Sequence, residues 1–274
     1  MLLTKAGLRK IVLVAAIYFL IGSFSLAVGL GVGNLFRDAG VNTAPLIRLA
    51  VIAYAVGFSS VFWGRYAEGK GKLLAKGTRL IFRELNPAEF IREYDALRES
   101  PGLVVCRPGP ELLQLLVAAY DALNDPAAAL AAADAQLAAA TGKWVIRAKM
   151  GKASLLYSYD RTEEAEAIFT EISRQKLGAV DTLMYDALLK VDRAVARGDY
   201  RTAEDYCLKK LGQGFPKPNP LETLYLHGKL ALLYERLGER EQALEHYRYC
   251  AENGGRIALR DKAAEALERL RGEA

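Results

Sequence analysis

The chain has 274 residues, of which 52% are hydrophobic, 25% are charged and three are cysteines. This composition excludes an intrinsically disordered chain, a collagen-like chain and a small disulfide-bonded scaffold. Residues 1–85 contain 11 lysines and arginines against three acidic residues, a net charge of +8, whereas the remainder carries −3. The pI of about 9.0 therefore reflects the N-terminal part of the chain, and it does not indicate a nucleic-acid partner.

Two apolar segments predict a transmembrane helical hairpin over residues 1–64. The first span covers about residues 11–33, and the second covers about residues 45–63, interrupted only by Arg48. A helix of roughly 23 residues is about 34 Å long, which is enough to cross a hydrocarbon core of about 30 Å. A secretory signal peptide is the competing interpretation, but the first apolar run is long for one and a second span follows it.

The basic residues that flank the two spans predict the orientation of the hairpin. Three precede the first span and six lie between residues 65 and 83, so we expect a two-pass protein of the cell (plasma or inner) membrane with both termini cytoplasmic. A basic amphipathic helix over residues 65–85 either contacts anionic lipid through residues 70–83 or forms a solvated connector. It belongs to a juxtamembrane region, residues 65–109, that continues with a capped helix from Asn86 and a linker.

From residue 110 onward the apolar residues follow helical periodicity, and a repeat is present. Small residues recur at Ala129, Ala165, Ala203 and Ala243, each after a turn that an amphipathic helix precedes. The spacing is roughly 36–40 residues, which is typical of repeats built from helix pairs. Over residues 110–257 the chain therefore resembles the tetratricopeptide repeat family, although that family repeats about every 34 residues. The longer spacing overlaps with the related Sel1-like repeats.

The resemblance implies an all-α protein. We expect the two-helix transmembrane hairpin to be followed, over residues 110–274, by a tetratricopeptide-like α-solenoid of about four helix pairs. A last amphipathic helix, from Arg256 to Arg271, is expected to cap the solenoid with a polar outer face. A protein of this plan is expected to be bacterial.

Reactive side chains are few. The two histidines, His227 and His246, are explained by packing or exposure. The three cysteines lack the spacing of a zinc site or a redox pair, and no phosphate-binding loop, nucleophile elbow or HExxH motif occurs. We therefore expect no enzyme, no catalytic residue, no cofactor and no metal site.

The family resemblance implies that the first helix of each pair lines a groove that binds a protein or peptide partner. Tyrosine and arginine contribute strongly to such interfaces, although half-buried packing is the alternative role of each tyrosine. The candidate partner-binding residues are Arg147, Tyr157, Tyr185, Asp192, Tyr225 and Arg236.

These observations predict a membrane-anchored adaptor or scaffold that binds protein or peptide partners at the cytoplasmic face of the membrane. Two alternatives remain open. In the first, the chain is an accessory subunit of a membrane transport or secretion complex. In the second, it is a membrane enzyme whose catalytic residues are not recognised.

Overall fold

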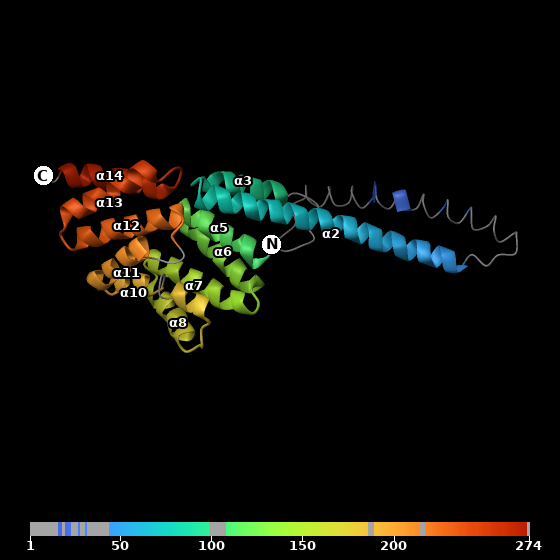
Figure 1. Ribbon diagram of the computed structural model, residues 1–274, viewed down its shortest axis with the longest axis horizontal. Helices are drawn as coiled ribbons and strands as arrows, with labels where there is room; N and C mark the ends of the chain where they lie inside the picture. Colours follow the sequence, from blue (N-terminus) through green and yellow to red (C-terminus); the bar gives the residue numbers. More distant parts are fainter. Residues whose placement is uncertain are drawn as a thin grey trace. The chain divides into compact units, whose positions relative to one another are not determined.

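The computed structural model of the protein describes residues 16–17, 20–22, 27, 31, 44–98, 108–185, 189–213 and 217–272. Within these ranges the regular structure is helical and no strand occurs, so the prediction of an all-α protein is confirmed (Figure 1). The helices are α2 (Ala44–Phe82), α3 (Pro87–Arg98), α5 (Pro110–Ala122), α6 (Pro126–Ala139), α7 (Lys143–Ser158), α8 (Thr162–Ser173), α9 (Ala179–Met184), α10 (Lys190–Ala196), α11 (Tyr200–Gln213), α12 (Pro220–Arg236), α13 (Arg240–Asn253) and α14 (Ala258–Gly272).

The chain forms two compact units. The first comprises Met1–Leu73 and Glu93–Arg107, and the second comprises Leu74–Arg92 and Pro108–Ala274. The boundary between the units falls inside α2 and α3. The division expected from the sequence, at residues 64 and 109, stays a prediction.

Helix α2 differs from the second membrane span predicted for residues 45–63. It continues without a break to Phe82, and its 39 residues include seven charged side chains, so its apolar residues form one end of a helix whose other end is charged. In the part of the chain that the structure describes, no helix is both long and apolar enough to cross a membrane. This finding corrects the predicted transmembrane hairpin and the predicted two-pass location in the cell membrane. The first predicted span, residues 11–33, lies mostly outside the described residues.

The basic end of α2 buries its apolar face within the protein. Leu80 and Ile81 are only 3% and 0% exposed, and Gly77 lies so close to the Phe90 ring of α3 that a Cβ atom at this position would sit 2.4 Å from it. The apolar face of the predicted lipid-binding helix is therefore occupied by internal packing. Lys72 and Arg83 remain on the exposed side, and contact with anionic lipid through residues 70–83 stays a prediction.

Four helix pairs of the second unit share one turn geometry. The pairs are α5–α6, α7–α8, α10–α11 and α12–α13, and in each turn one residue adopts a positive φ, between 57° and 76°. Asparagine, aspartate and glycine tolerate this left-handed conformation best. The four residues, listed in chain order, are Asn124, Asp160, Gly198 and Gly238.

The alanines that revealed the repeat lie at the close crossing of each helix pair. All four, Ala129, Ala165, Ala203 and Ala243, are 0% exposed. The backbone N–H of each donates to the carbonyl of the residue four positions earlier, at 2.9–3.2 Å, which starts the second helix at the same point in every pair. The second helices of the four pairs therefore begin with the same local geometry.

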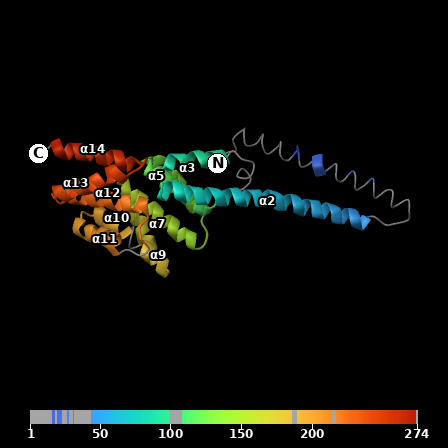
Figure 2. The ribbon, with the colours of Figure 1, turned by 45° about the horizontal axis from the view of Figure 1, so that its top comes forward.

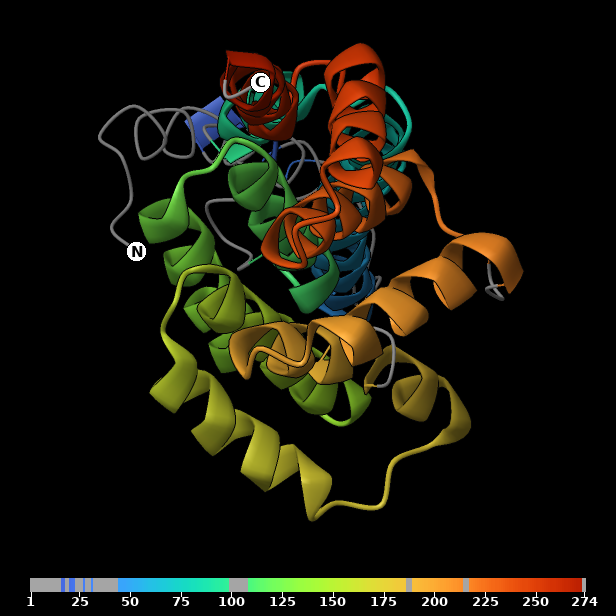
Figure 3. The same ribbon diagram turned by 90° about the vertical axis from the view of Figure 1, so that its left-hand side faces the viewer.

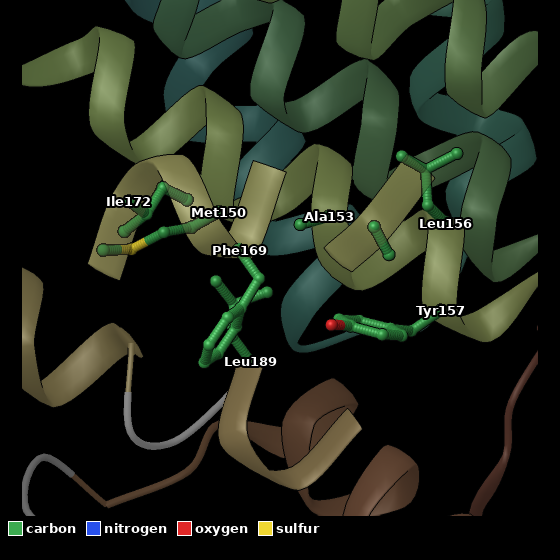
Figure 4. Packing of buried hydrophobic residues seen from close by; sticks show 8 residues of the cluster. Met150, Ala153, Leu156, Tyr157, Phe169, Ile172 and Leu189 are labelled. Carbon is green, nitrogen blue, oxygen red and sulfur yellow. The ribbon is translucent and has the colours of Figure 1, made fainter. Parts of the chain in front are cut away.

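Side chains from both helices of a pair fill the core between them. In the second pair, Met150, Ala153 and Leu156 of α7 pack with Phe169 and Ile172 of α8, as Figure 4 shows. Each of these side chains is buried. Burial of one such large side chain contributes about 1.5–3 kcal/mol, so the contact between the helices of this pair stabilises the fold.

Within the second unit, the pairs curve so that the first lies next to the fourth (Figure 3). The Tyr225 hydroxyl of α12 donates a hydrogen bond to Asp121 of α5 at 2.9 Å, although the two residues are far apart in the sequence. Helix α14 packs beside α13 and α12 (Figure 2). Its apolar side chains Ala263, Leu267 and Leu270 are buried, while most of its charged residues are exposed.

The turn between α2 and α3 contacts the turn between α13 and α14. Leu85 is buried with a positive φ of 51°, and its carbonyl accepts a hydrogen bond from the Arg256 N–H at 2.9 Å. Gly255, also with a positive φ, leaves room for Leu85, since a Cβ atom at this glycine would lie 2.6 Å from the Leu85 Cβ. The beginning and the end of the second unit are therefore joined.

Candidate partner-binding site on the first helices

The first helices of the four pairs are α5, α7, the interrupted α9 and α10, and α12. They carry the six residues that the sequence singled out. Local sequence fixes where these helices begin. At α12, for example, the Asn219 side chain accepts from the Glu222 N–H while the Glu222 carboxylate accepts from the Asn219 N–H, and Pro220 occupies the first turn. This capping box positions the inner side chains of α12.

Asp192 joins three first helices. It lies on α10 with only 5% of its surface exposed. The Ser154 hydroxyl of α7 donates to one carboxylate oxygen at 2.5 Å, and the Lys229 ammonium of α12 pairs with the other. Burial alone would lower the pKa of Lys229, but the charge and hydrogen bond of Asp192 outweigh it, and the pKa is raised. Lys229 therefore stays charged and neutralises the buried carboxylate.

Asp121 of α5 forms a second polar centre. It accepts hydrogen bonds from the Tyr159 hydroxyl at 2.7 Å and from the Tyr225 hydroxyl at 2.9 Å. Burial, and then the negative charge of Asp121, raises the pKa of Tyr225 well above its ordinary value. Both phenols therefore remain protonated donors, and Asp121 connects the first, second and fourth pairs.

Arg147 and Tyr185 also have partners within the protein. The Arg147 Nε donates to Asp181 of α9 at 2.9 Å, and both side chains are largely covered. The Tyr185 ring stacks on Phe169 with a centroid separation of 5.3 Å, and the Lys190 ammonium lies 5.8 Å from its centre. These two predicted groove residues therefore help to hold α7, α8 and α9 together.

Tyr157 belongs to the hydrophobic cluster against which Tyr185 also packs. It is 6% exposed, and its hydroxyl donates to Glu166 of α8 at 3.0 Å, so it packs inside the second pair. Residue 157 thus falls on the side of α7 that faces α8, and its role in a partner-binding groove stays a prediction. Arg236, in contrast, is exposed at the end of α12.

The structure thus brings Asp192 and Tyr225 into one polar network and leaves Arg236 at the surface. Sequence reasoning missed the roles of Lys229 and Tyr159. One signal for Lys229 was present, because it follows Tyr225 by four residues and therefore lies on the same face of α12.

Reactive groups in the second unit are buried or paired. The thiols of Cys207 and Cys250 are free and buried, and burial raises the pKa of Cys207 to about 11. Cys106 lies outside the described residues. Among the residues that the structure places, no group of three or more histidine, cysteine, aspartate or glutamate side chains is arranged to hold a metal ion.

Comparison with known proteins gives one partial match. No family model and no solved structure matches the chain. Delta-aminolevulinic acid dehydratase from two strains of Mycobacterium tuberculosis, CDC 1551 / Oshkosh and ATCC 25618 / H37Rv, is 34% identical over 95 residues. These residues make up 34% of this chain and 29% of each dehydratase, so the chain spans less than a third of the length of these relatives.

This match corrects one expectation from the sequence. We expected a protein without enzymatic function, whereas a third of the chain is similar to part of an enzyme. The comparisons do not bear on the resemblance to the tetratricopeptide family, which stays a prediction.

Proposed function

We propose that the second unit is a tetratricopeptide-like α-solenoid of four helix pairs, capped by α14, that acts as an adaptor or scaffold for a protein or peptide partner. The four equivalent turns and the buried alanines support the repeat assignment. Stacked helix pairs present a continuous surface built from their first helices, and such surfaces suit extended partners.

The observation that carries this proposal is a stripe on α12. Tyr225, Lys229, Leu232 and Arg236 are spaced by four, three and four residues, so they share one helix face. The first two are held in the buried polar network. The last two continue the stripe at the surface, where Leu232 is 39% exposed and Arg236 is exposed. A large apolar side chain exposed beside an arginine combines two kinds of contact that a partner can use.

The buried network prepares this stripe for binding. Asp121 and Asp192 tie α12 to α5, α7 and α10, so α12 need not be ordered when a partner arrives. A surface fixed in advance binds more tightly because less conformational freedom is lost. The exposed end suits a partner segment that presents an apolar side chain close to a carboxylate, which a guanidinium binds well.

Site-specific photo-crosslinking in the full chain tests the proposal. A photoreactive residue at position 232 or 236 should capture the same partner, whereas one at the exposed position 242 on α13 should not. Arg236→Ala should weaken capture by about tenfold, a typical loss for an interface arginine, while the exposed control Arg174→Ala should leave it unchanged. Equal capture from positions 232, 236 and 242 would contradict a partner site on α12.

The partial match favours a second candidate function, an activity on delta-aminolevulinic acid. The purified full chain should then consume delta-aminolevulinic acid faster than a sample without protein. An unchanged substrate concentration would remove this candidate and leave the partner-binding proposal intact.

A further inference from the structure

The chain contains only two histidines, and the structure brings them together. His227 lies on α12 and His246 on α13, and their Nδ1 atoms are 2.8 Å apart. The two helices are the halves of the fourth pair, so the contact bridges the pair from one side. Two rings that share an N···N contact of this length need one donor and one acceptor, which requires at least one neutral imidazole.

Neighbouring aromatic rings fix both imidazoles. The His227 ring stacks on Tyr249 with a centroid distance of 3.8 Å and an interplanar angle of 15°. The His246 ring is nearly parallel to Tyr234, at 5.4 Å and 4°. Because aromatic stacking restricts ring rotation, the two Nδ1 atoms are held facing each other before any ligand arrives.

The pair borders a surface hollow of about 200 Å³. Two carboxylates, Glu245 and Glu252, and one guanidinium, Arg248, line the same hollow with Tyr249. Acidic groups therefore outnumber basic ones around the imidazoles, and the hollow has room for water. A cation placed beside the histidines would meet a net negative lining.

Burial disfavours the protonated form of both imidazoles. It lowers the pKa of His227, a positive charge on His246 would lower it further, and Glu245 acts in the opposite direction. Burial also lowers the pKa of His246. Neutral imidazole is the form that binds transition metals, since a protonated nitrogen has no free lone pair.

We propose that His227 and His246 form a two-histidine site for a divalent transition-metal ion, with Ni²⁺ and Cu²⁺ preferred. Imidazole suits both ions, and the affinity of a nitrogen site rises along the first-row series towards Cu²⁺. The 2.8 Å between the Nδ1 atoms is the length of their hydrogen bond, and an ion with bonds of about 2.0 Å would replace the shared proton once the two rings turn towards it. Water completes the coordination, and the carboxylates of the hollow supply the opposing charge.

Metal binding at this site would clamp α12 to α13. The ion would contact one ligand from each helix, and it would bind the folded pair better than the unfolded chain. The melting temperature should therefore rise with the concentration of the ion.

Calorimetric titration of the full chain with NiCl₂ tests this inference. The protein must be free of a histidine tag, so that His227 and His246 supply its only imidazoles. We expect one Ni²⁺ per chain and a higher melting temperature. His227→Gln and His246→Gln should each weaken binding by about tenfold or more, because even the loss of an outer partner costs about 10–100-fold. The control Arg248→Gln should retain binding, since it removes only a positive charge that repels the ion.

A second measurement does not depend on the variants being folded. Paramagnetic Ni²⁺ bound at the site should broaden the imidazole proton signals of the wild-type protein at one equivalent. The inference is overturned if these signals stay sharp at millimolar Ni²⁺, or if folded His227→Gln and His246→Gln variants bind Ni²⁺ as tightly as the wild type.

Discussion

Glu166 illustrates how a single carboxylate organises the second helix pair. Its two oxygens accept hydrogen bonds from the Arg193 guanidinium at 2.7 and 2.8 Å, and one also accepts from Tyr157. Arg193 in turn lies over the Phe169 ring, 3.9 Å from its centre. The hydrogen bond from Arg193 lowers the pKa of Glu166, against the effect of burial, and the bond from Tyr157 lowers it further. The ionised form is therefore the one that stabilises the fold.

A lowered pKa in the folded state makes stability depend on acidity in a defined direction. The contribution of Glu166 is complete above its unfolded pKa of about 4.3 and is lost as the pH falls through its lower folded value. Glu166→Gln should cost about 1 kcal/mol at pH 7, since the pair is partly exposed. Urea unfolding between pH 7 and pH 3 should show a smaller loss of stability for the variant than for the wild type. Parallel pH profiles for the two proteins would contradict this role.

At the scale of elements, the turns inside the four helix pairs are more alike than the helices that they connect. The unequal spacing of Ala129, Ala165, Ala203 and Ala243 shows that the helices vary, while the left-handed residue stays at the same place in each turn. Gly238 has a φ of 76°, and a Cβ atom there would meet nothing within 4 Å. A side chain would have space at this position, so glycine is favoured here by the backbone conformation alone.

Gly238→Ala should destabilise the fourth pair by about 1 kcal/mol, because alanine is strained at a positive φ even in open space. Gly151 provides a matched control. It lies inside α7, where a Cβ atom also meets nothing within 4 Å, so Gly151→Ala should stabilise the protein by about 0.5–1 kcal/mol. Thermal or urea unfolding of the two variants measures both effects. If both substitutions change the free energy of unfolding in the same direction, the positive φ of Gly238 does not determine the effect.

The sequence predicted the elements well where local rules act. The helical periodicity predicted an all-α protein, because it depends on residues close together in the chain. The site was harder to predict. Tyr225 and Asp121 meet across more than 100 positions, and no local pattern encodes that contact. The correction to the predicted membrane hairpin has a different, local cause, since apolar content alone did not reveal that α2 continues to Phe82 with charged residues along its second half.

At the scale of the whole second unit, the contact between Leu85 and Gly255 joins the beginning of the unit to its end. An open series of repeats frays from its free ends, because each repeat contacts only its neighbours. Here the α2–α3 turn touches the α13–α14 turn, and Gly77 and Phe90 pack near Leu115 of α5. The two ends of the stack are therefore expected to unfold together.

Gly255→Ala tests this coupling. A Cβ atom at this position would lie 2.6 Å from the Leu85 Cβ and 3.2 Å from its carbonyl oxygen, at a φ of 55°. We expect a loss of about 1–3 kcal/mol from the clash, with amide hydrogen exchange accelerating in α14 and in residues 80–86 alike. Gly272→Ala, where a Cβ atom meets nothing, is the control and should leave exchange unchanged. Faster exchange in α14 alone would argue against coupled ends.

The same closure has a consequence for synthesis on the ribosome. Leu85 leaves the ribosome about 170 residues before Arg256, its hydrogen-bond partner. At about 5–20 residues per second, the α2–α3 turn waits roughly 10–30 s for the chain segment that covers it. During that interval Leu85 lacks its contacts with Gly255 and Arg256. The nascent chain therefore spends most of its elongation as an unclosed intermediate, and a fragment that stops before Gly255 is expected to keep this surface open.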